Sequence, residues 1–197
     1  RAFGIPRPPL EVYVSDDAGN PLPADTPGEL MVRAMGDDPR HGFFSGYLNQ
    51  PEETERAWAG GWFHTGDIVT QRADGMLSFV DRKKNIIRRS GENIAAAEIE
   101  EALIEHSFVR SVAVLAVDDE FHDEEIMACI VPMTSQDGGA EAAEGIVDWA
   151  RDRLARHKLP GWICFVDEVP VTGTQKIQKG AIFDKDSDPR QDPCSID

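Results

Sequence analysis

The chain has 197 residues, of which 41% are hydrophobic, and its 36 acidic side chains outnumber 20 lysines and arginines to give a net charge of −16. This length fits one large domain or two small ones. Phosphate backbones and anionic lipid repel so acidic a chain, which argues against nucleic acid or a membrane surface as partner. Apolar runs such as 112–117 fall far short of the ~20 residues that a membrane span needs.

The first part of the chain is predicted to be rich in β-strands. Apolar patterning predicts strands over 10–14 and 28–34, followed by a proline-initiated helix over 51–58. Two further strands, 67–71 and 76–80, flank an Ala-Asp-Gly sequence that is typical of a hairpin turn.

The pattern changes near residue 82, where helical and strand signals begin to alternate. The expected elements are a helix over 95–106, strands over 111–117 and 125–131, a loop over 135–140, a helix over 141–157 and a strand over 162–166. An α-β-β-α-β order of this kind predicts a compact α+β unit.

We therefore expect three parts. Residues 1–81 form a β-rich piece, which is expected to be the remnant of a larger N-terminal domain, and 82–184 form a small α+β domain. The tail 185–197 is expected to be disordered, because residues 184–197 contain five aspartates and two prolines.

The three cysteines, Cys129, Cys164 and Cys194, are widely spaced and form no CxxC pair. The spacing therefore indicates neither a disulfide framework nor a thiolate zinc site, and a reducing cytoplasm fits best. The five histidines form no constellation of metal ligands, so no metal site is predicted.

Five of the twenty basic residues fall within eight positions: Arg82, Lys83, Lys84, Arg88 and Arg89. Such an island fits either a solvated turn or a site for a polyanion such as a nucleotide or coenzyme. Gly91 follows it, and a glycine there can let the backbone approach a ligand or can simply form a turn.

Two other segments could carry chemistry. The Thr65-Gly66-Asp67 turn can present a carboxylate to a ribose diol, or it can cap its own backbone. Lys176 lies in a segment of small residues from which a lysine can neutralise developing negative charge, or it can be a solvated surface lysine. No P-loop, GxSxG or HExxH sequence occurs.

Taken together, four segments resemble successive motifs of the adenylate-forming, AMP-binding enzymes. These segments are GYLNQPEETERAW at 46–58, GGWFHTGD at 60–67, DRKKNIIRRSGENIAAAEIE at 81–100 and TGTQKIQK at 172–179. The family contains acyl-CoA synthetases, luciferases and peptide-synthetase adenylation domains, and the resemblance covers the C-terminal third of such enzymes, from Phe3 to Phe183. The chain departs from the family at Gln175, where a glycine is usual.

The resemblance implies an ATP-dependent acid–CoA ligase, in which a small carboxylic acid and ATP give acyl-AMP and pyrophosphate, and CoA then displaces AMP. ATP, Mg²⁺ and CoA are the implied cofactors, with Mg²⁺ bound mainly upstream. The phosphate loop and the acyl pocket of the family lie upstream too, so the chain alone is expected to be inactive and to need its N-terminal domain.

The resemblance also assigns roles to residues. Asp67 and Arg82 bind the ATP ribose, Lys84 is the hinge about which the C-terminal domain rotates, and Lys176 is the catalytic lysine of adenylation. The thioester-forming loop contains Gly91, Glu92 and Asn93, and the candidates for contact with the CoA nucleotide are Lys158 and Trp162.

Two alternatives remain open: an adenylation domain that loads a carrier protein, and a non-catalytic α+β interaction module. We also expect that a lysine acetyltransferase can modify Lys176, because its loop is exposed and acetylation removes the charge.

Overall fold

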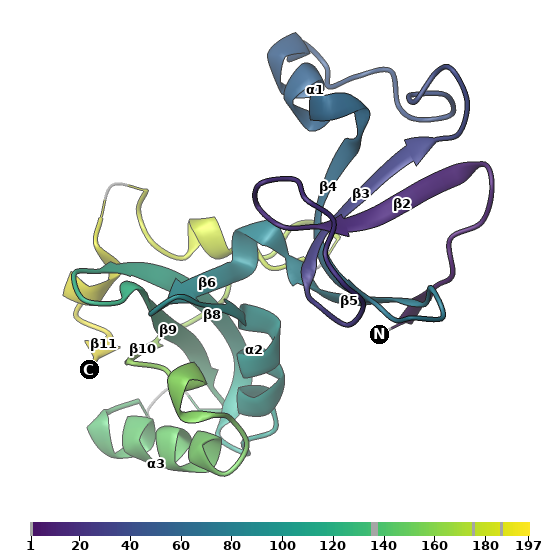
Figure 1. Ribbon diagram of the computed structural model, residues 1–197. Coiled ribbons are helices and arrows are strands. Elements are labelled where there is room, and N and C mark those ends of the chain that lie inside the picture. The colour runs from purple at the N-terminus through teal and green to yellow at the C-terminus, as the bar shows by residue number, and fades with distance from the viewer. Residues whose placement is uncertain (1, 135–137, 175, 186) are drawn as a thin grey trace. The chain divides into compact units, whose positions relative to one another are not determined.

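The computed structural model describes residues 2–134, 138–174, 176–185 and 187–197, and it divides into two compact units, Arg1–Lys84 and Asn85–Asp197 (Figure 1). Each unit has its own sheet and its own apolar core. The predicted loop at 135–140 lies partly, and Gln175 wholly, outside the described residues.

The first unit is an antiparallel sheet in the order β1-β5-β4-β3-β2. Its strands are β1 (Ala2–Gly4), β2 (Leu10–Ser15), β3 (Gly28–Ala34), β4 (Phe63–Gln71) and β5 (Leu77–Arg82). Successive side chains of a strand point to opposite faces, so the apolar positions of these strands gather on one face. The buried core there consists of Val14, Leu30, Val69 and Leu77.

The helix of this unit, α1 (Pro51–Ala57), begins at its proline as predicted, and the 3-10 helix η1 (Ala59–Gly61) follows it. Trp58 is 3% exposed. Its ring lies 5.0 Å from that of Phe43 and 5.4 Å from that of Phe63, between centroids. These aromatic contacts join α1 to the start of β4.

The second unit combines a six-stranded sheet with two helices. Its strands are β6 (Ile86–Arg89), β7 (Glu92–Ala95), β8 (Val109–Asp119), β9 (Asp123–Pro132), β10 (Trp162–Phe165) and β11 (Ser195–Ile196). Its helices are α2 (Ala96–Ile104) and α3 (Ala140–Arg151), with 3-10 helices η3 (Arg156–Lys158), η4 (Lys179–Ala181) and η5 (Pro189–Gln191). A further 3-10 helix, η2 (Lys83–Asn85), spans the division between the units.

In this sheet the order is β11-β10-β9-β6-β7, with β8 paired to β9. Alternate residues of β9 serve two apolar clusters. Ile126, Ala128 and Ile130 pack with α2 and α3, which cover one face of the sheet (Figure 1). Met127 and Cys129 pack on the opposite face. The predicted α+β class is confirmed.

Helix ends differ from the predictions. The helix expected over 141–157 ends at Arg151, because the backbone turns there and the N–H groups of Arg153 and Leu154 both bond to the Ala150 carbonyl. The turn brings Leu154 into the core at 9% exposure. Within the described residues no helix is long and apolar enough to cross a membrane.

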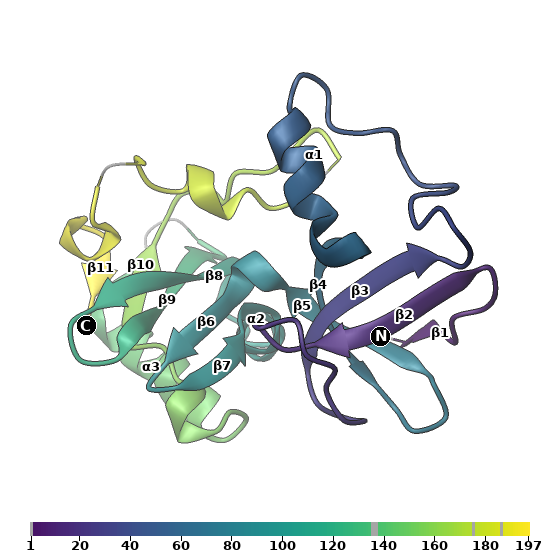
Figure 2. The same ribbon diagram turned by 45° about the horizontal axis from the view of Figure 1, so that its top comes forward.

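The C-terminal tail is the first correction. Residues 187–197 carry η5 and β11 in place of the expected disorder, and β11 pairs antiparallel with β10 (Figure 2). The side chain of Asp188 caps η5 by accepting a hydrogen bond from the Arg190 N–H, at 3.0 Å. The acidic side chains therefore cap turns, while Cys194 and Ile196 face apolar clusters.

The cysteines are the second correction. Cys164 and Cys194 form a disulfide across 30 residues of sequence, although no disulfide was predicted. Sequence spacing was a poor guide because β10 pairs with β11 and aligns Cys164 with Ser195, the neighbour of Cys194. Cys129 is a free, fully buried thiol, and burial raises its pKa to about 12.

Candidate functional site

Asp67 stands on an irregular stretch of β4 whose pairing with β3 shifts register between Glu29 and Met31. Gly66 adopts a φ of 68°, which favours glycine. The Thr65 hydroxyl donates to the Leu30 carbonyl at 2.8 Å and accepts from the Asp67 N–H at 3.1 Å. Thr65-Gly66-Asp67 is therefore a fixed β-bulge, a feature that re-aims side chains in many sites.

Asp67 and Arg82 are cross-strand partners of β4 and β5, and Arg82 Nε lies 2.9 Å from Asp67 Oδ1. Arg82 also donates to the Thr65 carbonyl at 3.3 Å. Burial raises the pKa of Asp67, the Arg82 charge opposes the rise, and Glu29 adds to it; the result lies above the usual value. Oδ1 is shielded from solvent and faces the Arg82 guanidinium, while the Asp67 side chain as a whole is 21% exposed.

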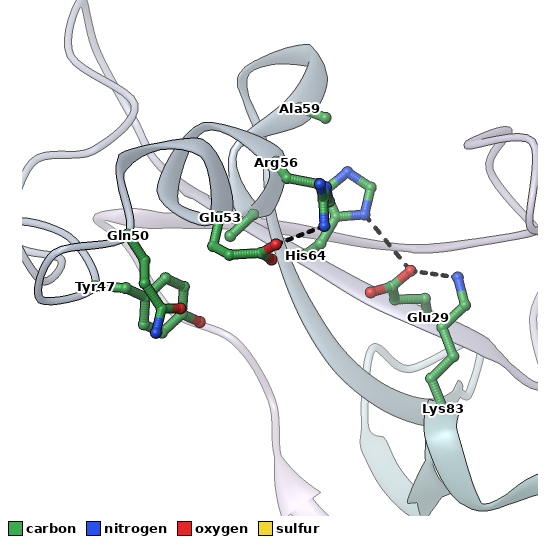
Figure 3. A pocket seen from close by; sticks show the side chains of 9 residues that line it. Glu29, Tyr47, Gln50, Glu53, Arg56, Ala59, His64 and Lys83 are labelled. Carbon is green, nitrogen blue, oxygen red and sulfur yellow. Dashed lines mark hydrogen bonds and ion pairs between the residues drawn. The ribbon is translucent and has the colours of Figure 1, made fainter. Parts of the chain in front are cut away.

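A cavity of about 530 Å³ lies within the first unit (Figure 3). Its lining residues are Glu29, Tyr47, Gln50, Glu53, Arg56, Ala57, Ala59, His64 and Lys83. On α1, Glu53 and Arg56 form an ion pair at 2.6 Å. Across the cavity, the Glu29 carboxylate lies between Lys83 Nζ at 2.9 Å and His64 Nδ1 at 3.5 Å.

Glu29 is the residue that sequence reasoning missed. It is 6% exposed in a strand with buried apolar neighbours. Burial alone raises its pKa, but Lys83, the Gly66 N–H and His64 outweigh burial and leave the pKa below its usual value. In the sequence, Glu29 could have been noticed as a single charged residue at the start of the apolar strand sequence GELMV.

In the second unit, Ser90 and Gly91 form the tip of the β6–β7 hairpin, with φ values of 51° and 80°. Positive φ at both central residues is characteristic of a type I′ turn. Glu92 and Asn93, expected on the same loop, instead begin β7, opposite Arg89 and Arg88.

Arg89 ties this hairpin to the segment that contains Lys158. Its guanidinium donates to the carbonyls of His157 and Leu159 at 3.0 and 3.1 Å and pairs with the buried Glu125 at 2.7 Å. Lys158 itself binds Glu98 at 2.7 Å. Trp162, the other candidate for CoA contact, packs in the apolar cluster around Cys129 and Cys164.

Lys176 lies on a narrow loop closed by the bridge between Val171 and Ile177. Its backbone exchanges hydrogen bonds with Thr172, and its side chain is exposed without an ion pair to any described residue. Lys179, three residues on, is only 18% exposed in its side chain and pairs with Glu100 of α2 at 2.8 Å. Lys176 is thus the lysine of this segment that is free to meet a ligand, while Lys179 anchors η4.

Lys84, the predicted hinge, is exposed and is the last residue of the first unit. The structure thus brings Asp67 and Arg82 together in one unit, and it holds the Gly91 hairpin and the Lys158 segment together in the other. Among the described residues no group of three or more His, Cys, Asp or Glu could hold a metal ion.

Comparison with known proteins gives a family for part of the chain. Residues 98–176 match the AMP-binding enzyme C-terminal domain. Feruloyl-CoA synthase of Amycolatopsis sp is 35% identical over 179 residues, and long-chain-fatty-acid–CoA ligase of Escherichia coli O6:H1 is 32% identical over 184. The matches cover 91% and 93% of this chain but 35% and 31% of those proteins, so the chain spans about a third of their length.

Solved structures agree. The o-succinylbenzoate CoA synthetase of Bacillus subtilis, bound to its acyl-adenylate intermediate, matches 91% of this chain with a TM-score of 0.75 and 27% identity, over 34% of its own length. The amide bond synthetase of Marinactinospora thermotolerans matches 90% with a TM-score of 0.71 and 35% identity, over 35% of its length.

Residues 98–176 therefore match the AMP-binding enzyme C-terminal domain, and the chain as a whole is similar to adenylate-forming enzymes, which confirms the predicted resemblance. Within that class, its curated relatives include several acid–CoA ligases.

Proposed function

We propose that this chain is the C-terminal portion of an ATP-dependent acid–CoA ligase. In the first half-reaction a carboxylate oxygen attacks the α-phosphorus of ATP, the bond to pyrophosphate breaks, and acyl-AMP forms. In the second, the CoA sulfur attacks the acyl carbonyl, the thiol proton passes to solvent, and AMP leaves.

The observation that carries the proposal is the Asp67–Arg82 pair on the fixed bulge. Arg82 holds Asp67 through Oδ1 at 2.9 Å, and the Asp67 side chain is still 21% exposed. A carboxylate in this state suits the two hydroxyls of the ATP ribose. Similarity to CoA ligases over 91% of the chain supports the same conclusion.

The other assignments belong to the same proposal. Lys176 neutralises charge during adenylation, because two anions must meet at the reacting centre. The unit that starts near Lys84 then rotates, so that the hairpin of Gly91, Glu92 and Asn93 replaces the lysine loop for thioester formation. Lys158 and Trp162 are the candidates for the CoA nucleotide, and Mg²⁺ and the acyl pocket belong to the upstream part.

Three finer points also remain proposals: a cytoplasmic location, acetylation of Lys176 by a lysine acetyltransferase, and inactivity of the isolated chain. The disulfide between Cys164 and Cys194 is the feature that fits a reducing compartment least.

The acceptor has one serious alternative, since a solved structure that is 35% identical to this chain is an amide bond synthetase. A carrier-protein thiol is another acceptor, and a non-catalytic interaction module is the alternative without chemistry.

The test uses the complete polypeptide that contains this chain. Carboxylate-dependent exchange of pyrophosphate into ATP is measured with ferulate, long-chain fatty acids and 4-hydroxybutyrate, the acids named by the relatives. We expect exchange with a carboxylic acid, its loss in Asp67→Ala, and its retention in Asp74→Ala, a change in an exposed turn. CoA, carrier protein and amines are then compared as acceptors, and no exchange with any acid would favour the non-catalytic module.

A further inference from the structure

Glu29 forms hydrogen bonds with the chain neighbours of the Asp67–Arg82 pair, Gly66 and Lys83. Its carboxylate accepts from the Gly66 N–H at 3.1 Å and from Lys83 Nζ at 2.9 Å. Gly66 directly precedes Asp67, and Lys83 directly follows Arg82. One buried side chain therefore holds the backbone next to one member of the pair and the side chain next to the other.

Both contacts support the chain directly beside the pair. Gly66, at a φ of 68°, has no other atom within 4 Å of the place where a Cβ would lie, so side-chain packing does not fix the bulge there. Lys83 lies in η2, directly after the strand that carries Arg82, and it also pairs with Asp17 at 3.3 Å. Without Glu29, both neighbours of the pair lose their buried partner.

A carboxylate is energetically unfavourable at this buried position unless other groups compensate its charge. Burying a charge is unfavourable unless it is paired and hydrogen-bonded, and the register of β3 needs only an inward-facing side chain. Two other ion-paired carboxylates of the first unit, Asp67 and Glu11, have side chains that are 21% and 37% exposed. Glu29, at 7%, is buried where the candidate nucleotide site is built.

We propose that Glu29 is a positioning residue for the ribose hydroxyls of ATP, acting by holding Gly66 and Lys83 so that Asp67 and Arg82 keep their mutual geometry. The inference rests on the proposed function, in which Asp67 binds those hydroxyls. Replacing Glu29 should therefore weaken binding only of nucleotides that carry the ribose hydroxyls. A purely structural role would weaken binding of nucleotides with and without them.

The experiment measures binding of ATP and of 2′,3′-dideoxy-ATP to the complete polypeptide. Glu29→Ala should weaken ATP binding about tenfold, as expected for the loss of a charged hydrogen bond, and leave dideoxy-ATP nearly unchanged. Glu29→Gln, which keeps an acceptor for the Gly66 N–H, should fall in between. Glu53→Gln is the matched control, because it removes a carboxylate of the same cavity, and it should bind both nucleotides like the wild type.

Adding Glu29→Ala to Asp67→Ala should cause no further loss of ATP binding, because Glu29 would act only through Asp67. Equal weakening of both nucleotides, or additive losses in the double variant, would overturn the inference. If Glu29→Ala does not fold, Lys83→Gln removes the other half of the same ion pair and must show the same hydroxyl-dependent loss. If Asp67→Ala does not change the ratio of the affinities for ATP and dideoxy-ATP, Asp67 does not bind the ribose hydroxyls. That result would contradict the proposed function itself, and the inference about Glu29 with it.

Discussion

The fold shifts the pKa values of two neighbouring carboxylates, Asp67 and Glu29, in opposite directions. Burial, with the charge of Glu29, keeps the pKa of Asp67 above its usual value despite Arg82. Lys83, the Gly66 N–H and His64 keep the pKa of Glu29 below its usual value despite burial. The charge of Asp67 thus lowers stability, whereas the charge of Glu29 raises it, and this difference fits the roles proposed for the two residues, ligand binding and support.

Asp67→Asn should therefore leave the free energy of unfolding unchanged or slightly increased at pH 7. The folded-state pKa lies above the reference of 3.8, so ionisation is harder in the folded chain than in the unfolded one, and the neutral amide removes that disadvantage. Urea denaturation of this chain at pH 7 gives the comparison. A clear loss of stability would show that Asp67 is mainly a structural partner of Arg82.

Glu29→Gln should have the opposite effect on stability. The lowered pKa means that Glu29 stabilises the fold above its unfolded-state pKa, near 4.5, and that this contribution disappears as the pH falls through the lower folded-state value. We expect a loss of about 1–3 kcal/mol at pH 7 for a buried charged hydrogen bond. Denaturation at pH 7 and at pH 3 checks the sign, and a loss that is as large at pH 3 would contradict it.

At the scale of elements, the strand β9 explains why the ordered C-terminal tail was not predicted. The helices cover only one of its two buried faces. Met127 and Cys129 alternate with Ile126, Ala128 and Ile130, so both faces of β9 are apolar. A strand of this kind needs cover on both sides. The helices were predicted and cover one face. The other face is packed by Ile182, Phe183 and Cys194, of which only Cys194 belongs to the tail 185–197 that was expected to be disordered.

The longer helices and strands could therefore be predicted, because helix and strand periodicities are local, whereas the short strands β1, β6 and β7 were not predicted. Two further features depend on contacts between distant segments: β11 forms only beside β10, and the Cys164–Cys194 bond follows from that pairing. In the site, Asp67, Arg82 and Lys176 were recognisable from motifs. Glu29 was not, because its contacts with Gly66 and Lys83 form only when β3 is paired with the bulge of β4.

Loss of the disulfide should weaken the second unit. Cys194→Ser removes the cross-link that holds the tail on the sheet, and a disulfide closing a loop of this length contributes roughly 2–4 kcal/mol. Urea denaturation of this chain with and without reductant measures the effect, and the variant should be insensitive to reductant. An unchanged midpoint for the reduced wild type would contradict a disulfide in the isolated protein.

At the scale of the whole molecule, the chain spans about a third of the length of its relatives, and its two units meet in sequence at Lys84 and Asn85. The proposed mechanism uses that division: it places Lys176 at the reacting centre for adenylation and removes the lysine for thioester formation. A charged side chain that is needed in only one half-reaction can be withdrawn from the other if it lies on a domain that rotates.

Lys84→Pro in the complete polypeptide should separate the two steps. Proline fixes φ near −65° and removes one backbone donor, so it restricts rotation about the hinge. We expect adenylation to survive better than thioester formation, with Lys84→Ala as the control that removes the side chain alone. Rates of pyrophosphate exchange and of CoA thioester formation are compared, and equal losses in both, or none, would exclude a hinge at this position.

The most direct test of the account is to assay the two half-reactions separately in Lys176→Ala of the complete polypeptide. Removing one preorganised cation typically lowers a rate by about 10²–10³-fold, so ATP-driven formation of acyl-AMP should fall by that amount. Conversion of preformed acyl-AMP and CoA to the thioester should stay near the wild-type rate, and Lys185→Ala, a change at another exposed lysine, should affect neither step. Undiminished adenylation, or an equal fall in both half-reactions, would contradict the assignment of Lys176 as the catalytic lysine.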